Sequence, residues 1–358
     1  MRSGWQTKTL GEVIQLEYGK PLEQTDRNPK GRYPAYGANG VKDRTNKFYR
    51  DIPSIVVGRK GSAGEITLTE EKFWPLDVTY FVEFDRQHYD LRFLYYLLAT
   101  LELPSLAKGV KPGINRNEVY ALPVNVPPLP EQQRIVGILD QAFDGIAIAK
   151  ANIEKNLQNA RALFESHLQS VFTQRGEGWV STALENCCEK ILAGGDVPKG
   201  RVSKVRTPQY SVPIYSNGTK RDGLYGFTDV AGVKSPSVTI SARGTIGFSA
   251  IRTEPHLPVV RLIVLIPDEE KIDTPFLHYA VSGMDFGNTG TSIPQLTVPN
   301  IRNRQIYYPT LSQQKSIVAK LDELRDETQR LASLYQRKLV ALDALKQSLL
   351  HQAFSGQL

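Results

Sequence analysis

Cysteine and long apolar runs are both scarce in this chain of 358 residues. Its two cysteines, Cys187 and Cys188, are adjacent, so they cannot build a disulfide framework, and a reducing, cytoplasmic environment is expected. No stretch approaches the roughly 18 consecutive apolar residues that a membrane-spanning helix needs. Residues 1–10 contain no apolar run either, so no signal peptide is expected.

Catalytic motifs are also lacking. No Walker sequence for nucleotide phosphates occurs, and the glycines between Gly58 and Gly64 have the wrong spacing for a dinucleotide-binding loop. The five histidines are scattered, and no pair of them has the spacing of metal ligands. These absences predict a chain with no catalytic residues, no metal site and no cofactor of its own.

What the chain does contain is a duplication. Pro127–Val136 aligns without a gap with Pro309–Val318, at an offset of 182 residues. Weaker matches precede it in the same order in both copies, and Lys60-Gly61, for example, corresponds to Arg243-Gly244. A period of this length is far too long for a solenoid repeat. We therefore expect a duplicated domain, each copy followed by a helix.

Each copy divides into a β-rich part and a helical part. Residues 1–128 and 176–311 are rich in Gly, Pro and short β-branched runs, which predicts two α+β domains. Residues 129–175 and 312–358 contain no proline after the first turn, which predicts two long helices. Within the domains we expect strands at 52–57, 78–84, 238–240 and 262–266, and one short helix in each, at 91–101 and at 275–281.

Both helical segments carry apolar residues at alternating steps of three and four, with Lys150 filling one gap in the first. Because the repeat offset is a multiple of seven, both helices share one register, and a seam of this length favours a coiled coil. The alternative is two separate amphipathic helices, each packed on its own domain. The predicted seam comprises Leu139, Ile146, Leu157 and Phe164 in the first helix and Leu321, Tyr335, Leu339 and Leu349 in the second.

The charge distribution indicates an anionic partner. The net charge is +7, and residues 27–60 hold nine basic residues against two acidic ones. The corresponding stretch of the second copy, 199–243, holds eight against two. Basic runs that recur in both copies, interleaved with tyrosine and asparagine, favour contact with double-stranded DNA.

Two glycine turns within these runs are candidates for phosphate contact, because glycine lets backbone N–H groups approach an anion closely. Their alternative is an ordinary tight turn. The candidate DNA contacts are Arg27, Lys30, Arg32, Tyr36, Asn39, Lys42, Arg44, Lys47, Arg59, Lys60 and Gly61 in the first domain, and Lys199, Arg201, Lys204, Arg206, Tyr215, Asn217, Lys220, Arg221, Arg243 and Gly244 in the second.

The segment from Pro128 to Ile135 resembles the entry to the central conserved region in specificity subunits of type I restriction-modification systems. The resemblance spans the chain: target recognition domain, conserved helix, second target recognition domain, second helix. One departure is Gln313, which stands where the family commonly has the glutamate found at Glu131. The chain is also somewhat short for the family.

The resemblance implies a fold with internal pseudo-two-fold symmetry, in which the two helices pack antiparallel and set the spacing of a bipartite DNA site. Each domain would read one half of that site. The chain would recruit two modification subunits, which bind S-adenosylmethionine and methylate adenine, and two restriction subunits can join to give an ATP- and magnesium-dependent nuclease. Two other functions stay open: a DNA-modifying enzyme, either methyltransferase or nuclease, with an unrecognised active site, and a coiled-coil adaptor without DNA contact.

Overall fold

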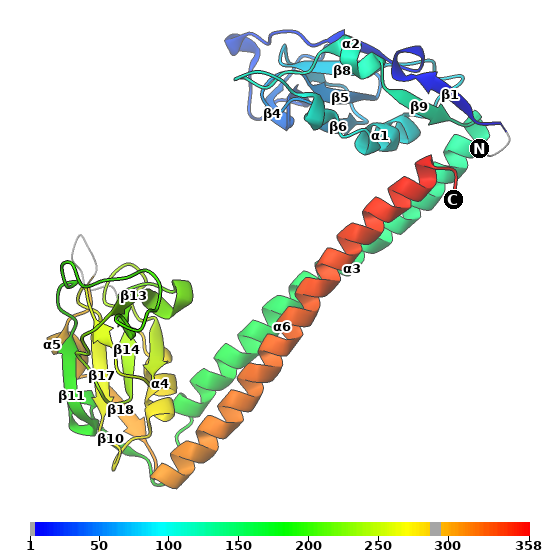
Figure 1. Cartoon of the computed structure of the whole chain (residues 1–358). Helices are drawn as coiled ribbons and strands as arrows, with labels where there is room; N and C mark the ends of the chain where they lie inside the picture. Colours follow the sequence, from blue (N-terminus) through cyan, green and yellow to red (C-terminus); the bar gives the residue numbers. More distant parts are fainter. Residues whose placement is uncertain (1–3, 287–294) are drawn as a thin grey trace. The chain divides into compact units, whose positions relative to one another are not determined.

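A computed structural model describes residues 4–286 and 295–358 of the chain. Two compact units make up the structure (Figure 1). The first comprises Met1–Glu154 with Gln336–Leu358, and the second comprises Lys155–Tyr335. Each unit contains one β-rich domain together with one end of each long helix. Residues of both helices belong to the hydrophobic core of each domain.

Three small sheets form the β-rich domain of the first unit. A four-stranded antiparallel sheet has the order β2-β8-β5-β6, a three-stranded sheet the order β4-β3-β7, and a two-stranded ladder joins β1 to β9. The bounds are β1 Gln6–Thr9, β2 Gln15–Tyr18, β3 Tyr33–Gly37, β4 Gly40–Thr45, β5 Ser54–Gly58, β6 Ile66–Thr69, β7 Trp74–Pro75, β8 Thr79–Glu83 and β9 Pro123–Val126.

The second unit repeats this topology strand for strand. Its sheets have the orders β11-β17-β14-β15, β13-β12-β16 and β10-β18. The predicted duplication of an α+β domain is therefore confirmed. The bounds are β10 Val180–Ala183, β11 Cys188–Ala193, β12 Val212–Tyr215, β13 Leu224–Thr228, β14 Ser237–Ile240, β15 Ser249–Arg252, β16 Leu257–Pro258, β17 Ile263–Pro267 and β18 Gln305–Tyr308.

The predicted short helices are α1, Leu91–Thr100, and α4, Thr274–Ser282. The expectation of only one short helix per domain is wrong, because each domain has a second, α2 (Arg116–Tyr120) or α5 (Val298–Arg302). Five residues are too few to show helical periodicity in a sequence. The domains also contain the 3-10 turns η1 Leu10–Glu12, η2 Gln24–Asp26, η3 Leu103–Leu106, η4 Leu184–Cys187 and η5 Lys220–Gly223.

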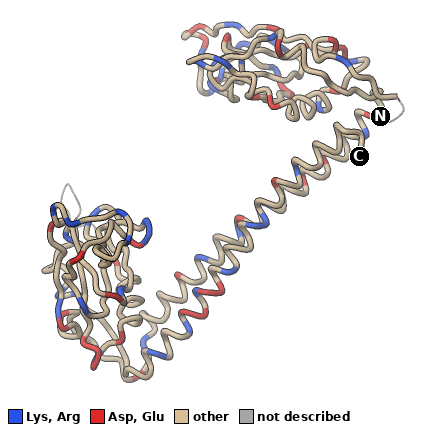
Figure 2. The backbone as a smooth tube through the Cα atoms, in the orientation of Figure 1, with Lys and Arg blue, Asp and Glu red and all other residues tan. Residues whose placement is uncertain are grey.

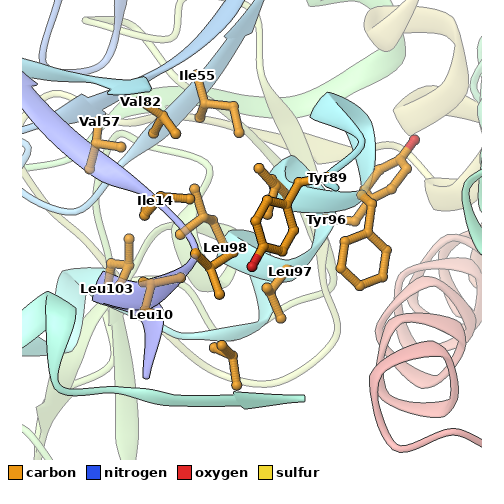
Figure 3. Close-up of a cluster of buried hydrophobic side chains, with 14 of the residues drawn as sticks. Leu10, Ile14, Ile55, Val57, Val82, Tyr89, Tyr96, Leu97, Leu98 and Leu103 are labelled. Atoms are coloured by element: carbon orange, nitrogen blue, oxygen red, sulfur yellow. The ribbon is translucent and has the colours of Figure 1, made fainter. Parts of the chain in front are cut away.

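The core of the first domain lies between the four-stranded sheet and α1 (Figure 3). Ile55, Val57 and Val82 from the sheet form one buried cluster with Leu97 and Leu98 of the helix. The helix begins where the Asp90 carboxylate accepts hydrogen bonds from two backbone N–H groups of its first turn. Burial of each large apolar side chain contributes about 2 kcal/mol, so this cluster fixes α1 on the sheet.

The two long helices, α3 (Leu129–Thr173) and α6 (Leu311–Phe354), run antiparallel. In the first unit, Leu139 near the start of α3 shares a buried cluster with Leu350 and Ala353 near the end of α6. In the second unit, Leu168 near the end of α3 clusters with Leu321 near the start of α6. The helices therefore pair with each other, and the alternative of two separate amphipathic helices is wrong.

The residues of the predicted seam are buried to different degrees. Leu139, Ile146 and Leu321 are buried, and the other five predicted seam residues are half-buried. Lys150, which occupies the polar gap in the periodicity, forms an ion pair with Asp343 of α6. The half-buried seam residues are Leu157, Phe164, Tyr335, Leu339 and Leu349.

A buried glutamine ties each domain to the long helix that follows it. The Gln132 amide is fully buried; its oxygen accepts from the Asp90 N–H at 2.9 Å, and its nitrogen donates to the carbonyls of His88 and Pro127 at 3.0 and 2.9 Å. Gln314 occupies the equivalent place in the second unit. It accepts from the N–H of Asp273 at 2.8 Å and donates to the carbonyls of Lys271 and Pro309, both at 2.9 Å.

A tyrosine–aspartate pair makes a second link between domain and helix in each unit. The Tyr96 hydroxyl of α1 donates to Asp140 of α3 at 2.5 Å, and Arg92 of α1 donates to the same carboxylate at 3.0 Å. Tyr279 of α4 and Asp322 of α6 repeat this bond at 2.6 Å. Their arginine, however, is Arg325 of the long helix, which lies 2.8 Å from Asp322. The same contact is thus built with an arginine from a different element.

We predict that Gln132→Leu destabilises the first unit, because it leaves one buried N–H and two buried carbonyls without partners. At about 1–3 kcal/mol for each unpaired group, the free energy of unfolding falls by at least about 3 kcal/mol. Urea denaturation measures the loss in free energy of unfolding. Hydrogen exchange of the Asp90 N–H in the folded protein measures the local effect. Gln133→Leu is the matched control: its side chain is exposed, and a shift within about 0.5 kcal/mol is expected. Equal losses in both variants would contradict the proposed role of the buried amide.

Candidate nucleic-acid interface

The basic runs lie mostly on and around the three-stranded sheets, β4-β3-β7 in the first domain and β13-β12-β16 in the second. Figure 2 shows lysines and arginines along these segments in both domains. The chain reverses sharply there, through Gly40 at φ +111° in the first hairpin and through Arg221 and Asp222, both in the left-handed region, in the second. The structure therefore brings each basic run onto one group of loops.

Some of the predicted cations in the first domain are free to meet a ligand. Lys30, Lys42 and Lys60 are exposed, and their side chains have no ion-pair partner within the described parts of the chain. Arg32 is exposed as well and lies 5.4 Å from the centre of the Tyr33 ring. Asn39 is exposed at the hairpin turn. These residues form the accessible part of the predicted interface.

Other cations of that run hold the loops together. Arg27 pairs with Asp43 at 3.4 Å, and Lys47 pairs with Asp26 at 2.7 Å. Arg44 donates to the carbonyls of Gly31 and Arg32, both at 2.6 Å. Side chains that already have partners contribute less to binding an anion, because a ligand must displace those partners or accept a partly neutralised charge.

Tyr36 is placed differently from its prediction. Only 6% of its surface is exposed, and its ring packs against Phe73, with ring centres 5.9 Å apart, in a small cluster with Val56 and Phe81. A side chain buried in this way is part of the domain core. Its burial argues against the predicted contact with DNA.

The predicted set in the second domain also divides into paired and free groups. Arg201 makes a bidentate pair with Asp229, with bonds of 3.0 and 2.7 Å that lower the pKa of the Asp229 carboxyl. Arg206 pairs with Glu254 at 2.6 Å. Lys204 lies 4.1 Å from the centre of the Tyr225 ring. The exposed cations without a side-chain partner in the described ranges are Lys199, Lys220 and Arg221.

The two polar candidates of the second domain are used inside it. Asn217 donates from its amide nitrogen to the Val260 carbonyl and accepts from the Ala242 N–H, both at 2.7 Å, so the side chain pins two loops together. Tyr215 is half-buried, and the buried Arg252 guanidinium lies 3.6 Å from its ring centre. The arrangement leaves both side chains less available for a ligand than their polarity indicated.

The two glycine turns are real and equivalent. Gly61 has φ +81° and Gly244 has φ +70°, a backbone region that residues other than glycine rarely adopt. A Cβ built on either glycine would meet no atom within 4 Å. Turn geometry alone accounts for glycine at these places. Lys60 next to the first turn is exposed, whereas Arg243 next to the second donates to Gln295 at 2.9 Å. Phosphate contact at these turns stays a prediction.

A further cationic site was missed by the sequence analysis. Tyr18, Tyr80, the loop residues 113–115 and the first two residues of α2 line a hollow of about 420 Å³. Arg116 is the first residue of α2, and the guanidinium of Arg59 is 5.4 Å from the Tyr18 ring centre. Tyr18 and Arg116 lie outside the basic run, on β2 and α2, so charge counting along the chain could not find them.

Among residues 4–286 and 295–358, no three His, Cys, Asp or Glu side chains are grouped so that they could hold a metal ion. Within the same ranges, every helix is too short or too polar to cross a membrane.

The chain is similar in sequence to specificity subunits from bacteria. A Mycoplasma pneumoniae protein named as a type I specificity subunit is 28% identical over 325 residues, which cover 89% of this chain and 88% of that protein. The EcoDI type I restriction enzyme specificity subunit of Escherichia coli is 23% identical over 99% of this chain and 88% of its own length.

Solved structures show the same fold. A chain from a structural study of complex assembly and conformational transition of the type I R-M system superposes with a TM-score of 0.81 at 18% identity, covering 100% of this chain and 99% of that one. The HsdS subunit from Thermoanaerobacter tengcongensis gives a TM-score of 0.65 at 20% identity, covering 100% and 98%.

The family model for the type I restriction modification DNA specificity domain matches twice, at residues 2–159 and 176–336. Each match contains one β-rich domain and the N-terminal part of the long helix that follows it. The first match ends within α3 and the second within α6. The two matches together cover most of the chain, in agreement with the duplicated topology. The chain therefore belongs to the family of type I restriction-modification DNA specificity proteins and carries two copies of its domain.

Proposed function

We propose that this chain is the DNA specificity subunit of a type I restriction-modification complex and that each domain reads one half of a bipartite site. The observation that carries the proposal is the duplicated anchoring: two domains of the same topology, each with exposed cations, are tied by equivalent glutamine contacts to one antiparallel helix pair. A pair of similar modules on a paired-helix support suits a DNA site with two separated halves.

The chain supplies recognition and leaves the chemistry to its partners. Two modification subunits would bind S-adenosylmethionine and transfer its methyl group to adenine. Restriction subunits, where the system has them, would use ATP and Mg²⁺. The chain would act in the cytoplasm, a setting that two cysteines without a disulfide also fit.

Two exposed leucines on the long helices support a docking site for two partners. Leu163 of α3 is 62% exposed and Leu345 of α6 is 47% exposed, and the two positions are separated by the repeat offset of 182 residues. The duplication thus presents the same apolar side chain twice. Exposed leucines at equivalent positions suit two copies of one partner, because each copy would meet a leucine at the same place along its helix.

Methylation in a defined mixture tests the function. We expect the purified chain with S-adenosylmethionine and DNA to give no methylation. Adding its cognate modification subunit should give adenine methylation at one bipartite motif, read by sequencing the modified DNA. Methylation by the chain alone would favour the alternative of a DNA-modifying enzyme. A complex that forms but methylates without any motif would overturn the proposed role in specificity.

We predict that Lys60→Gln weakens DNA binding and flattens its salt dependence by about one charge, because each phosphate contact releases about one counterion. Binding isotherms between about 50 and 200 mM salt give the slope. Lys47→Gln is the matched control in the same domain: it removes the same charge from a lysine that is already paired with Asp26. If both variants give the wild-type slope, the Lys60 turn does not contact the DNA backbone.

We predict that Leu163→Asp and Leu345→Asp each remove one of two modification subunits, since each places a charge in one apolar contact. Native mass spectrometry should then show complexes with a single modification subunit, and the double variant should show none. Both positions are exposed, so folding should be retained. Gln158→Asp, on a different exposed face of α3, should leave two subunits bound. Retention of both partners by the double variant would contradict docking at these leucines.

A further inference from the structure

In the first domain, one exposed tyrosine ring and the three side chains around it form a cluster. Tyr18, which is 49% exposed at the end of β2, has its ring centre 5.0 Å from that of Tyr80 on the paired strand β8. The guanidinium groups of Arg59 and Arg116 each lie 5.4 Å from the centre of the Tyr18 ring. Arg116 is also 5.9 Å from the Tyr120 ring, so two aromatic rings restrict its position.

The two arginines differ in what they have left to donate. Arg59 uses its Nε and Nη2 groups on the Asp77 carbonyl, at 3.2 and 2.5 Å. Arg116 makes one long bond, from Nη1 to the Leu16 carbonyl at 3.4 Å. Its Nε and Nη2 groups have no partner among the residues that the structure describes. They are neighbouring donors on one edge of the guanidinium, which suits two adjacent acceptors on a ligand.

The surroundings are cationic and polar. Arg116 and the amides of Asn115 and Asn117 line the hollow of about 420 Å³ together with the two tyrosines. Lys60 pairs through its backbone with Gly113 of the lining loop and is exposed. The nearby acid Glu118 is already paired with Lys108 at 2.7 Å. A ligand that enters here meets positive charge and hydrogen-bond donors.

The second domain has equivalent strands and an equivalent short helix at this place, but neither the tyrosines nor the arginines. The strand pairs Tyr18–Tyr80 and Ala193–Ile263 occupy equivalent places in the two ladders, β2-β8 and β11-β17. Arg59 precedes Lys60-Gly61 in the first domain, and Ala242 precedes the equivalent Arg243-Gly244 in the second. The first residue of the short helix is Arg116 in α2 and Val298 in α5.

This difference separates ligand binding from folding. Small or apolar residues at all four positions of the second domain support the same sheets and the same short helix. The fold therefore does not require two tyrosines and two arginines here. Charged side chains that the scaffold can do without, gathered around a hollow, indicate a ligand contact that only the first domain makes.

We propose that this hollow is a base-reading site of the first domain and that Arg116 recognises the major-groove edge of one guanine. The O6 and N7 atoms of guanine are adjacent acceptors, and a basic side chain, arginine or lysine, is their commonest specific partner. The stacking of Arg116 on Tyr18 and Tyr120 orients its free edge before DNA arrives, which lowers the entropy lost on binding. Binding a phosphate requires only positive charge and hydrogen-bond donors, which the exposed Lys60 beside the hollow also supplies. The inference rests on the proposed function, because it assigns a role to one of the two domains in reading DNA.

The test uses the full chain assembled with its modification subunit, on DNA in which each base pair of the first half-site is changed in turn. Arg116→Ala should weaken binding of the cognate site by about tenfold to a hundredfold. It should also abolish the preference for one G·C pair while preferences at other positions and the salt slope persist. Arg116→Lys, which keeps the charge but loses the two-donor edge of the guanidinium, should keep only part of that preference. Thermal unfolding of both variants checks that the domain is intact.

Lys111→Ala is the matched control: Lys111 comes two residues before the lining segment, is exposed and has no side-chain partner in the described ranges. It should lower affinity on all sequences alike and reduce the salt slope by about one. The same pattern in Arg116→Ala would show a phosphate contact and overturn the inference, as would full discrimination in that variant. Wild-type complex that discriminates at neither half-site would instead overturn the proposed function, so the two failures are distinguishable.

Discussion

A buried side-chain amide determines how each domain meets its helix. Gln132 and Gln314 join three backbone groups, two from the segment ahead of the short helix and one from the entry to the long helix. Removing an amide from water without partners is costly, so the geometry in which all three bonds form is strongly preferred. The direction in which each long helix leaves its domain follows from that preference.

The duplication separates what must be kept from what can vary. The sheets, the glutamine anchors and the tyrosine–aspartate links occur in both units with nearly the same distances. The surfaces above them differ: a bidentate Arg201–Asp229 pair has its place in the second domain, and a tyrosine–arginine cluster in the first. Two domains with one scaffold and different surfaces can read different half-sites without changing how they are held.

The sequence predicted the duplication, the alternation of domains and long helices and the pairing of those helices, because repeat offset and heptad spacing are properties of the chain itself. It could not predict which charges are free. Lys60 and Lys47 are alike in the sequence, yet only one has a carboxylate partner, and that partner, Asp26, comes from another loop. Tyr36 shows the same limit for burial, since its strand is covered by the Phe73 cluster rather than exposed on one face. The cluster around Tyr18 needs β2, β8 and α2 to meet, which only the tertiary fold arranges.

The tyrosine–aspartate links carry an asymmetry that the rest of the duplication conceals. Their arginine belongs to the domain in the first unit, as Arg92, and to the long helix in the second, as Arg325. The position of the first helix that corresponds to Arg325 is Phe143, whose ring packs on Tyr96. If the domains were exchanged between their helices, one junction would gather two guanidinium groups around a single carboxylate, and the other would leave an aspartate with no cation at all. The two positions are therefore structurally alike but not interchangeable, and new pairings of domains would have to include the helix residue that completes each link.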